Sequence, residues 1–245
     1  MNHDVVVPIV EGRGEEAAVP ILLDRWFRHR DFHNVRVHVK GPICSRGNGH
    51  LTASFDAAKK RGVEYYIKIA LLLDPAPDAV LILLDAERGR PRTLGADLLA
   101  RARREVSEGF PIAVVFANSE YEAWLLAALA SPRFRQAIDQ SESSPGLCSL
   151  PPETDVEAIV DCKKRVADLI LGEAYSPTVH QKKLTEILPF TQAVLRRSRS
   201  FRKLLKDLDG LLQEARRRRA DSGKRLMSGW TVRRRGGRPT PLARA

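Results

Sequence analysis

The chain is poor in cysteine and has no cysteine spacing of a metal or disulfide motif. Its 245 residues include three cysteines, Cys44, Cys148 and Cys162, and no Cys-x-x-Cys pair. An odd number without that spacing argues against both a disulfide framework and a zinc site. The six histidines show no metal spacing either. This composition is typical of a reducing compartment, and we expect a cytoplasmic location.

Long apolar runs and familiar nucleotide motifs are also missing. The longest apolar stretches, 79–84 and 123–130, fall far short of the roughly 20 residues that a membrane helix needs. The opening residues, MNHD, lack the basic segment of a signal peptide. A Walker loop, a nucleophile elbow and a complete dinucleotide fingerprint are absent. We therefore expect no membrane contact and no P-loop chemistry.

Acidic residues are nearly absent from the end of the chain. The formal net charge is +11, but residues 216–245 contain eleven of the 41 Lys/Arg and one of the 30 Asp/Glu. The preceding residues are therefore almost neutral, with 30 basic and 29 acidic side chains. This argues against a broad basic binding face on the folded body.

Apolar runs alternate with helical periodicity in the first part of the chain. Apolar, β-branched runs cover residues 5–10, 79–84 and 111–117, and at 35–39 valines alternate with polar residues, as in a half-exposed strand at a sheet edge. Helical spacing of apolar residues covers residues 15–28, 51–73, 94–106 and 120–130, with Gly62 as a weak point inside the second. This order predicts an α/β domain over residues 1–135, with a mainly parallel sheet flanked by helices.

The remainder of the chain is predicted to be helical and then disordered. Residues 131–153 are rich in Ser, Pro and Gln and indicate a surface connection. Thr154 and Glu157 have the spacing of a capping box that opens a helix. We expect a helical extension over residues 150–215. The basic tail, 216–245, offers little to bury and is expected to be disordered.

Carboxylates follow three of the four predicted strands. Glu11 follows the first, Asp85 and Glu87 follow the third, and Glu120 and Glu122 follow the fourth. Ligands of open α/β sheets bind beyond the carboxyl ends of the strands. Carboxylate oxygens are the ligands that Mg²⁺ takes in proteins, usually with waters and substrate phosphate oxygens. The sequence thus predicts a site for Mg²⁺, with Mn²⁺ as a substitute, at this edge.

Structural interpretations compete with this one at several positions. Glu15 and Glu16 lie in a helical first turn, where acids interact well with the helix dipole, and we favour that interpretation for them. Glu120 and Glu122 fit a first-turn role and a functional role equally well. The side chains of Arg13 and Lys182 are suited to contact phosphate, but a solvated side chain would give the same pattern.

Three motifs resemble a known family. They are VPIVEGRGEEAAVPILL (7–23), VVFANSEYEAWLLAA (114–128) and YSPTVHQKKLT (175–185), and they resemble the TOPRIM-like family catalogued as domain of unknown function 4276. More broadly, IVEG at 9–12 and Asp-Ala-Glu at 85–87 resemble the TOPRIM domain of topoisomerases, primases and nucleases, which has a glutamate after its first strand and Asp-x-Asp after its third.

The resemblance implies a TOPRIM-like sheet and roles for the acids. Glu11 would act in acid/base chemistry or bind metal, and Asp85 and Glu87 would bind Mg²⁺. Glu120 and Glu122 would be further acids. The second acid of the Asp-x-Asp pair is here Glu87, whose side chain is one methylene longer.

These observations lead to two main expected functions, and a simple nucleic-acid binder that uses only the basic tail ranks last, because it leaves the acids at three strand ends unexplained. The first is a metal-dependent nuclease, or a related phosphoryl-transfer enzyme, that acts on nucleic acid. The alternative is a non-catalytic module that binds a partner protein such as a nucleic-acid-associated ATPase.

Overall fold

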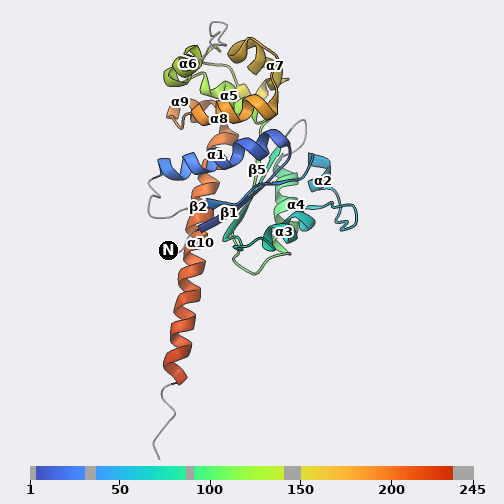
Figure 1. Cartoon of the computed structure of the whole chain (residues 1–245), viewed down its shortest axis with the longest axis vertical. Coiled ribbons are helices and arrows are strands. Elements are labelled where there is room, and N and C mark those ends of the chain that lie inside the picture. Colours follow the sequence, from blue (N-terminus) through green and yellow to red (C-terminus); the bar gives the residue numbers. More distant parts are fainter. Residues whose placement is uncertain (1–3, 31–36, 87–90, 141–149, 234–245) are drawn as a thin grey trace, which may run out of the picture.

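The computed structural model describes residues 4–30, 37–86, 91–140 and 150–233. A sheet in which every pairing is parallel lies at its centre (Figure 1). The strand order is β2 (Val37–Val39), β1 (Asp4–Val10), β4 (Ala79–Asp85) and β5 (Ile112–Ala117), and a short β3 (Ile43–Cys44) also pairs with β1. The predicted α/β fold class is therefore confirmed.

The register of the central strands places their carboxyl ends at one edge. Val10 of β1 pairs with Leu83 of β4, and Asp85 of β4 pairs with Ala117 of β5. All seven residues of β1 are buried, as expected for a strand covered on both faces. Residues that follow β1, β4 and β5 therefore meet at the same edge.

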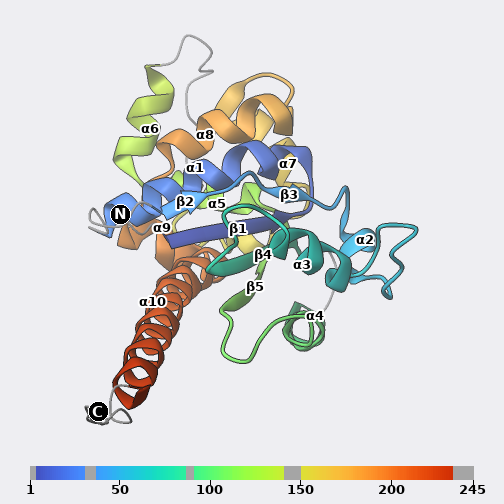
Figure 2. The ribbon, with the colours of Figure 1, turned by 60° about the horizontal axis from the view of Figure 1, so that its bottom comes forward.

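Helices cover both faces of the sheet (Figure 2). One face packs against α2 (Asn48–Thr52), α3 (Val63–Leu71) and α4 (Pro91–Arg103). The other face packs against α1 (Arg13–His29) and the helical elements that follow β5. Side chains of β1 alternate between these layers: Val5, Val7 and Ile9 face one, and Val6 and Val10 face the other.

The elements after β5 share a hydrophobic core with α1 and the sheet. They are α5 (Glu122–Ala128), α6 (Pro132–Asp139), η1 (Val156–Ala158), α7 (Cys162–Val166), η2 (Ala167–Leu171), η3 (Pro177–Gln181), α8 (Lys182–Ile187), α9 (Gln192–Arg197) and α10 (Arg199–Arg233). Trp124 of α5 packs against Phe201 of α10, with 5.2 Å between ring centroids. Within the described part of the chain, no helix combines the length and apolarity needed to cross a membrane.

The single helix predicted over residues 51–73 is wrong. Two helices, α2 and α3, stand in its place, with a turn between them in which Asp56 and Arg61 form an isolated bridge. Gly62 precedes α3 with φ of +89°, a conformation that side-chain-bearing residues rarely adopt. A Cβ there would lie 2.7 Å from the Cα of Phe55, so the glycine also permits a close backbone contact.

The disorder predicted from residue 216 onward is also wrong for its first part. α10 continues to Arg233 and extends away from the body (Figure 1). Arg216 and Arg219 form ion pairs with the buried Asp4 at 3.0 and 2.9 Å, and Arg219 also pairs with Asp78 at 2.6 Å. The basic run is helical because its arginines neutralise carboxylates at the amino end of β1 and just before β4. Residues 234–245 lie outside the described residues.

Candidate carboxylate site

Glu11 and Asp85 meet at the carboxyl edge of the two central strands. Glu11 directly follows β1, and its Oε2 accepts the backbone N–H of Asp85 at 3.2 Å. Asp85 ends β4, and its Oδ1 accepts the backbone N–H of Tyr121 at 2.9 Å. Asn48 donates to the backbone carbonyl of Asp85 at 3.2 Å. The third strand end is thus joined to the first two through Tyr121.

Glu120 and Glu122 lie at this edge but have different surroundings. Glu122 is fully buried, and its carboxylate makes no hydrogen bond of normal geometry within the described residues. The Tyr175 hydroxyl is nonetheless close enough to stabilise its charged form. Glu120 is half-buried and pairs through Oε1 with the Lys163 ammonium at 2.8 Å. Its Oε2 is buried without a hydrogen-bond partner in the described part of the chain. Glu122 is therefore more than a solvated first-turn acid.

Like charges at this edge change the protonation of Asp85. Burial raises the pKa of its carboxyl well above the usual value, and the negative charges of Glu15, Glu122 and Glu11 raise it further. The Lys163 ammonium opposes the shift. Burial also raises the pKa of Glu122, and the positive charge of Lys163 again lowers it in part. The shifts show that acids from separate elements are close enough to repel.

Lys163, the second residue of α7, is a cation that lies among these acids. Burial disfavours its charged form, but the charges of Glu122, Glu120 and Asp85 outweigh that effect and raise its pKa. Sequence reasoning missed Lys163. It lies 43 residues after Glu120, in a segment whose only signal was helical periodicity. Its position depends on the packing of α7 against α5.

Gln181 is a second residue that the sequence did not reveal. It is fully buried, and its Nε2 donates to Glu15 Oε1 at 3.2 Å, while Glu15 Oε2 accepts the backbone N–H of Gly12 at 3.0 Å. Glu15 thus has the structural first-turn role that we favoured. Gly14 allows η3 to pack closely, because a Cβ there would lie 1.9 Å from Gln181 Oε1 and 2.8 Å from Pro177 Cβ.

The other predicted site residues are less closely connected to this cluster. Arg13 begins α1 and Lys182 begins α8, and both side chains are exposed. Helix α1 packs against both η3 and α8, which brings the starts of α1 and α8 near one another. Glu87, predicted as a metal ligand, lies outside the described residues.

The capping box predicted at Thr154 and Glu157 is wrong. Asp155, not Thr154, accepts the N–H of Glu157, at 3.1 Å, and the turn that follows is the short η1. The Glu157 carboxylate is buried and accepts from Ser198 Oγ at 2.9 Å and Ser200 N at 2.6 Å. Burial would raise the pKa of Glu157, but these donors and Asn118 outweigh it and lower the pKa. Glu157 is an ionised acid that ties the start of α10 to the end of β5.

A groove opens beside the end of β5. Its volume is about 580 Å³, and α4, β5, η1 and α10 supply its walls. Phe116 and Leu99 belong to its apolar lining, whereas Arg92, Arg199 and Lys203 supply positive charge. Asn118 also lines the groove, and Glu120 follows it by two residues in the chain, so the groove lies next to the acidic edge.

The negative charge of the carboxylates suits a divalent cation, but the described side chains do not form a complete coordination shell. The buried oxygens of Glu122 and Glu120 that make no hydrogen bond of normal geometry within the described residues, and the mutual repulsion at Asp85, favour a bound cation. However, the described part of the chain contains no group of three or more His, Cys, Asp or Glu side chains placed to hold one. Mg²⁺ often takes one or two carboxylates and completes its shell with water and phosphate oxygens.

Together these features define an all-parallel α/β protein with a carboxylate cluster at the carboxyl edge of its sheet. Residues 10–209 match the family described as Domain of unknown function (DUF4276), and the chain belongs to that family. No curated protein and no solved structure matches the chain.

Proposed function

We propose that the protein is a metal-dependent nuclease, or a related phosphoryl-transfer enzyme of TOPRIM type, that acts on nucleic acid at the carboxylate edge. The observation that carries the proposal is the meeting of Glu11 and Asp85 at the carboxyl edge, where Glu11 Oε2 accepts the Asp85 N–H at 3.2 Å. Burial and acids from other elements also raise the pKa of Asp85. Titratable groups perturbed by a cleft and by specific charge partners are concentrated at functional sites.

Each acid has a role in this proposal. Asp85 and Glu11 would hold Mg²⁺ or Mn²⁺, with Glu120 and Glu122 completing the acidic surroundings. A bound cation would neutralise the phosphate and lower the pKa of an attacking water. Glu11, held against Asp85 by a hydrogen bond to its N–H, would accept a proton from that water. Lys163 would position Glu120 through their ion pair.

The cationic groove next to this edge supports nucleic acid as the substrate. Arg92 is exposed and has no ion-pair partner in the described part of the chain, so it can contact a phosphate without losing an internal bond. Arg13 and Lys182 add exposed positive charge at the start of α1 and α8. Such contacts fix a polyanion in position without selecting its sequence.

Cleavage assays on the full chain test the proposal. Single- and double-stranded DNA and RNA are incubated with Mg²⁺ or Mn²⁺, with EDTA as the metal-free control. We expect cleavage that needs the cation and falls about 100-fold or more in Glu11→Gln, as for loss of a general base. Asp85→Asn should have an effect of similar size.

Asp24→Asn is the matched control. Asp24 is an exposed acid on α1 that pairs with Arg28 at 2.8 Å, so its replacement removes one carboxylate away from the edge. The control should retain full activity. Cleavage that persists in Asp85→Asn, or that does not depend on a divalent cation, contradicts the proposal.

A non-catalytic binding module is the alternative, and two observations favour it. The acids do not form a three-ligand group within the described residues, and α10 extends away from the body as an arm for a partner protein (Figure 1). A nucleic-acid-associated ATPase is the partner we propose for this case. Absence of both cleavage and Mn²⁺ binding in the full chain would support it.

A further inference from the structure

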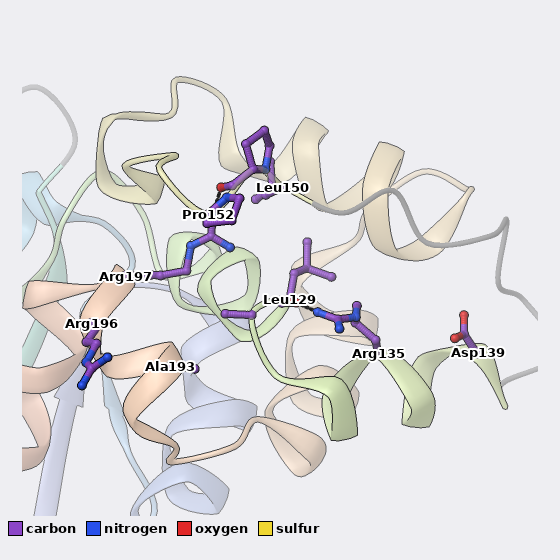
Figure 3. Close-up of a pocket in the computed structure, with 10 residues that line it drawn as sticks. Leu129, Arg135, Asp139, Leu150, Pro152, Ala193, Arg196 and Arg197 are labelled. Atoms are coloured by element: carbon purple, nitrogen blue, oxygen red, sulfur yellow. Dashed lines mark hydrogen bonds between the residues drawn. The ribbon is translucent and has the colours of Figure 1, made fainter.

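A second pocket lies at the opposite end of α5 from Glu122. Its volume is about 780 Å³, which is within the range of sites for small molecules. Leu129, Ala130, Leu150, Pro151, Pro152 and Ala193 form its apolar walls. Its charged side chains are Arg135, Asp139, Arg196 and Arg197 (Figure 3). Apolar walls with a few polar groups are typical of a ligand site.

Two of these arginines are held in place by backbone carbonyls. Arg135 of α6 donates to the carbonyl of Leu129 at 2.5 Å, and Arg197 of α9 donates to the carbonyl of Pro151. Figure 3 shows their guanidinium groups approaching the space near Leu129 from opposite sides, whereas Arg196 points away. A guanidinium has five N–H donors, so one carbonyl contact leaves others for a ligand.

The lining of the pocket has more positive than negative charge, with three arginines and Asp139. Within the described residues, neither Arg135 nor Arg197 forms an ion pair with a carboxylate, and both side chains are half-buried. The Nε of Arg197 is buried and has no acceptor in that part of the chain. Buried donors are normally paired, and a charged group without a counterion is costly. The excess of positive charge in the lining favours an anion in the pocket.

We propose that this pocket binds the phosphate group of a small molecule, with Arg135 and Arg197 as its ligands. A tetrahedral phosphate presents oxygens in several directions, and it can therefore accept hydrogen bonds from two guanidinium groups that line the same pocket. Guanidinium is well suited to phosphate, because its planar donors match two oxygens at once. The apolar walls would contact the remainder of the ligand.

Calorimetric titration of the full chain with pyrophosphate tests this site. We expect saturable binding that weakens at least tenfold in Arg135→Met and in Arg197→Met. Arg133→Met is the matched control, because Arg133 is exposed on the same helix and does not line the pocket. The control should bind pyrophosphate as tightly as the wild type does. Thermal melts identify a variant that fails to fold, and the other variant then provides the test.

Further probes distinguish the ligand chemistry. ATP should bind more tightly than pyrophosphate if a bulky group occupies the apolar part of the pocket, and succinate should bind at least tenfold more weakly. Equal binding of succinate would overturn the assignment to phosphate. Absence of pyrophosphate binding at millimolar concentration, or equal weakening by Arg133→Met, would overturn the site. These measurements need no nuclease activity, so they are independent of the proposed function.

Discussion

The carboxylate of Glu11 accepts the backbone N–H of Asp85, with 3.2 Å between Oε2 and N. The two residues are 74 positions apart in the chain, and each lies at the carboxyl end of a central strand. This hydrogen bond keeps the Glu11 carboxylate beside Asp85, although the negative charges of the two side chains repel each other. Asp85 in turn accepts the N–H of Tyr121, which leads into α5.

Replacement of Asp85 by Asn should stabilise the protein at pH 8. Burial and neighbouring acids raise the pKa of Asp85 in the folded state, so its charged form opposes folding. The folded chain then binds more protons than the unfolded chain, and stability falls as pH rises from the unfolded pKa through the folded one. Asn carries no charge and retains an oxygen for the Tyr121 N–H. Thermal melts should show a higher Tm for the variant, by about 2–4 °C for each kcal/mol gained.

The same comparison at pH 4 provides the control. There the folded-state carboxyl keeps its proton and the unfolded-state carboxyl is about half protonated, so the charge penalty is small and the two melting temperatures should converge. A variant that is less stable than the wild type at pH 8 would contradict the arrangement. The variant should also lose Mn²⁺ binding, which calorimetry measures.

Replacement of Lys163 by Met should destabilise the protein by about 1–2 kcal/mol at pH 8. Removing one partner of a buried pair costs more than that, but Lys163 is 42% exposed and solvent screens part of its effect. The cost should shrink between pH 8 and pH 5, because the raised pKa of Asp85 and of Glu122 makes both acids take up protons at a higher pH than usual, which removes charges that Lys163 neutralises. Denaturant unfolding at both pH values measures the difference.

Lys164→Met is the control for this prediction. Lys164 is the next residue, is 67% exposed and pairs with Asp168, which lies four residues later in η2. Its replacement should change stability by less than about 0.5 kcal/mol. Equal costs for the two variants would show that Lys163 has no special role among the acids.

Gly14→Ala should destabilise the protein by about 1–3 kcal/mol, as for overpacking of a filled site. The added Cβ would lie 1.9 Å from Gln181 Oε1 and 2.8 Å from Pro177 Cβ, so η3 would have to move away from α1. Gly210→Ala is the matched control in α10, where a Cβ meets no atom within 4 Å. That control should gain up to about 1 kcal/mol from helix propensity. A neutral Gly14→Ala in chemical denaturation would contradict the close packing.

Loss of both Arg216 and Arg219 should destabilise the body, although they belong to the basic tail. Asp4 is 1% exposed and pairs with both, so their replacement by Ala leaves a buried carboxylate uncompensated. The expected cost is about 3–5 kcal/mol. Arg217→Ala is the control, because Arg217 is exposed and lies between them. A double variant as stable as this control, measured by urea unfolding, would show that the tail is dispensable for the fold.

The sequence itself determined the strands and the positions of the acids after them. The runs at 5–10, 79–84 and 111–117 are local signals, since a strand buried on both faces needs continuous apolar residues. Parallel strands connected by helices then bring their carboxyl ends to one edge, so Glu11 and Asp85 were predictable as neighbours. Family membership followed from three short motifs for the same reason, because motifs are local.

Only the tertiary structure decided which residues complete the site and the fold. Lys163 and Gln181 reach the acidic edge through packing of α7 and η3, and Arg216 and Arg219 bind Asp4 across more than 200 residues. Local periodicity carries no information about such partners. A charged run of arginines is the same in sequence whether it is solvated or paired with buried acids. Burial and charge pairing arise only when distant segments pack together, and they determine which of these arginines are paired.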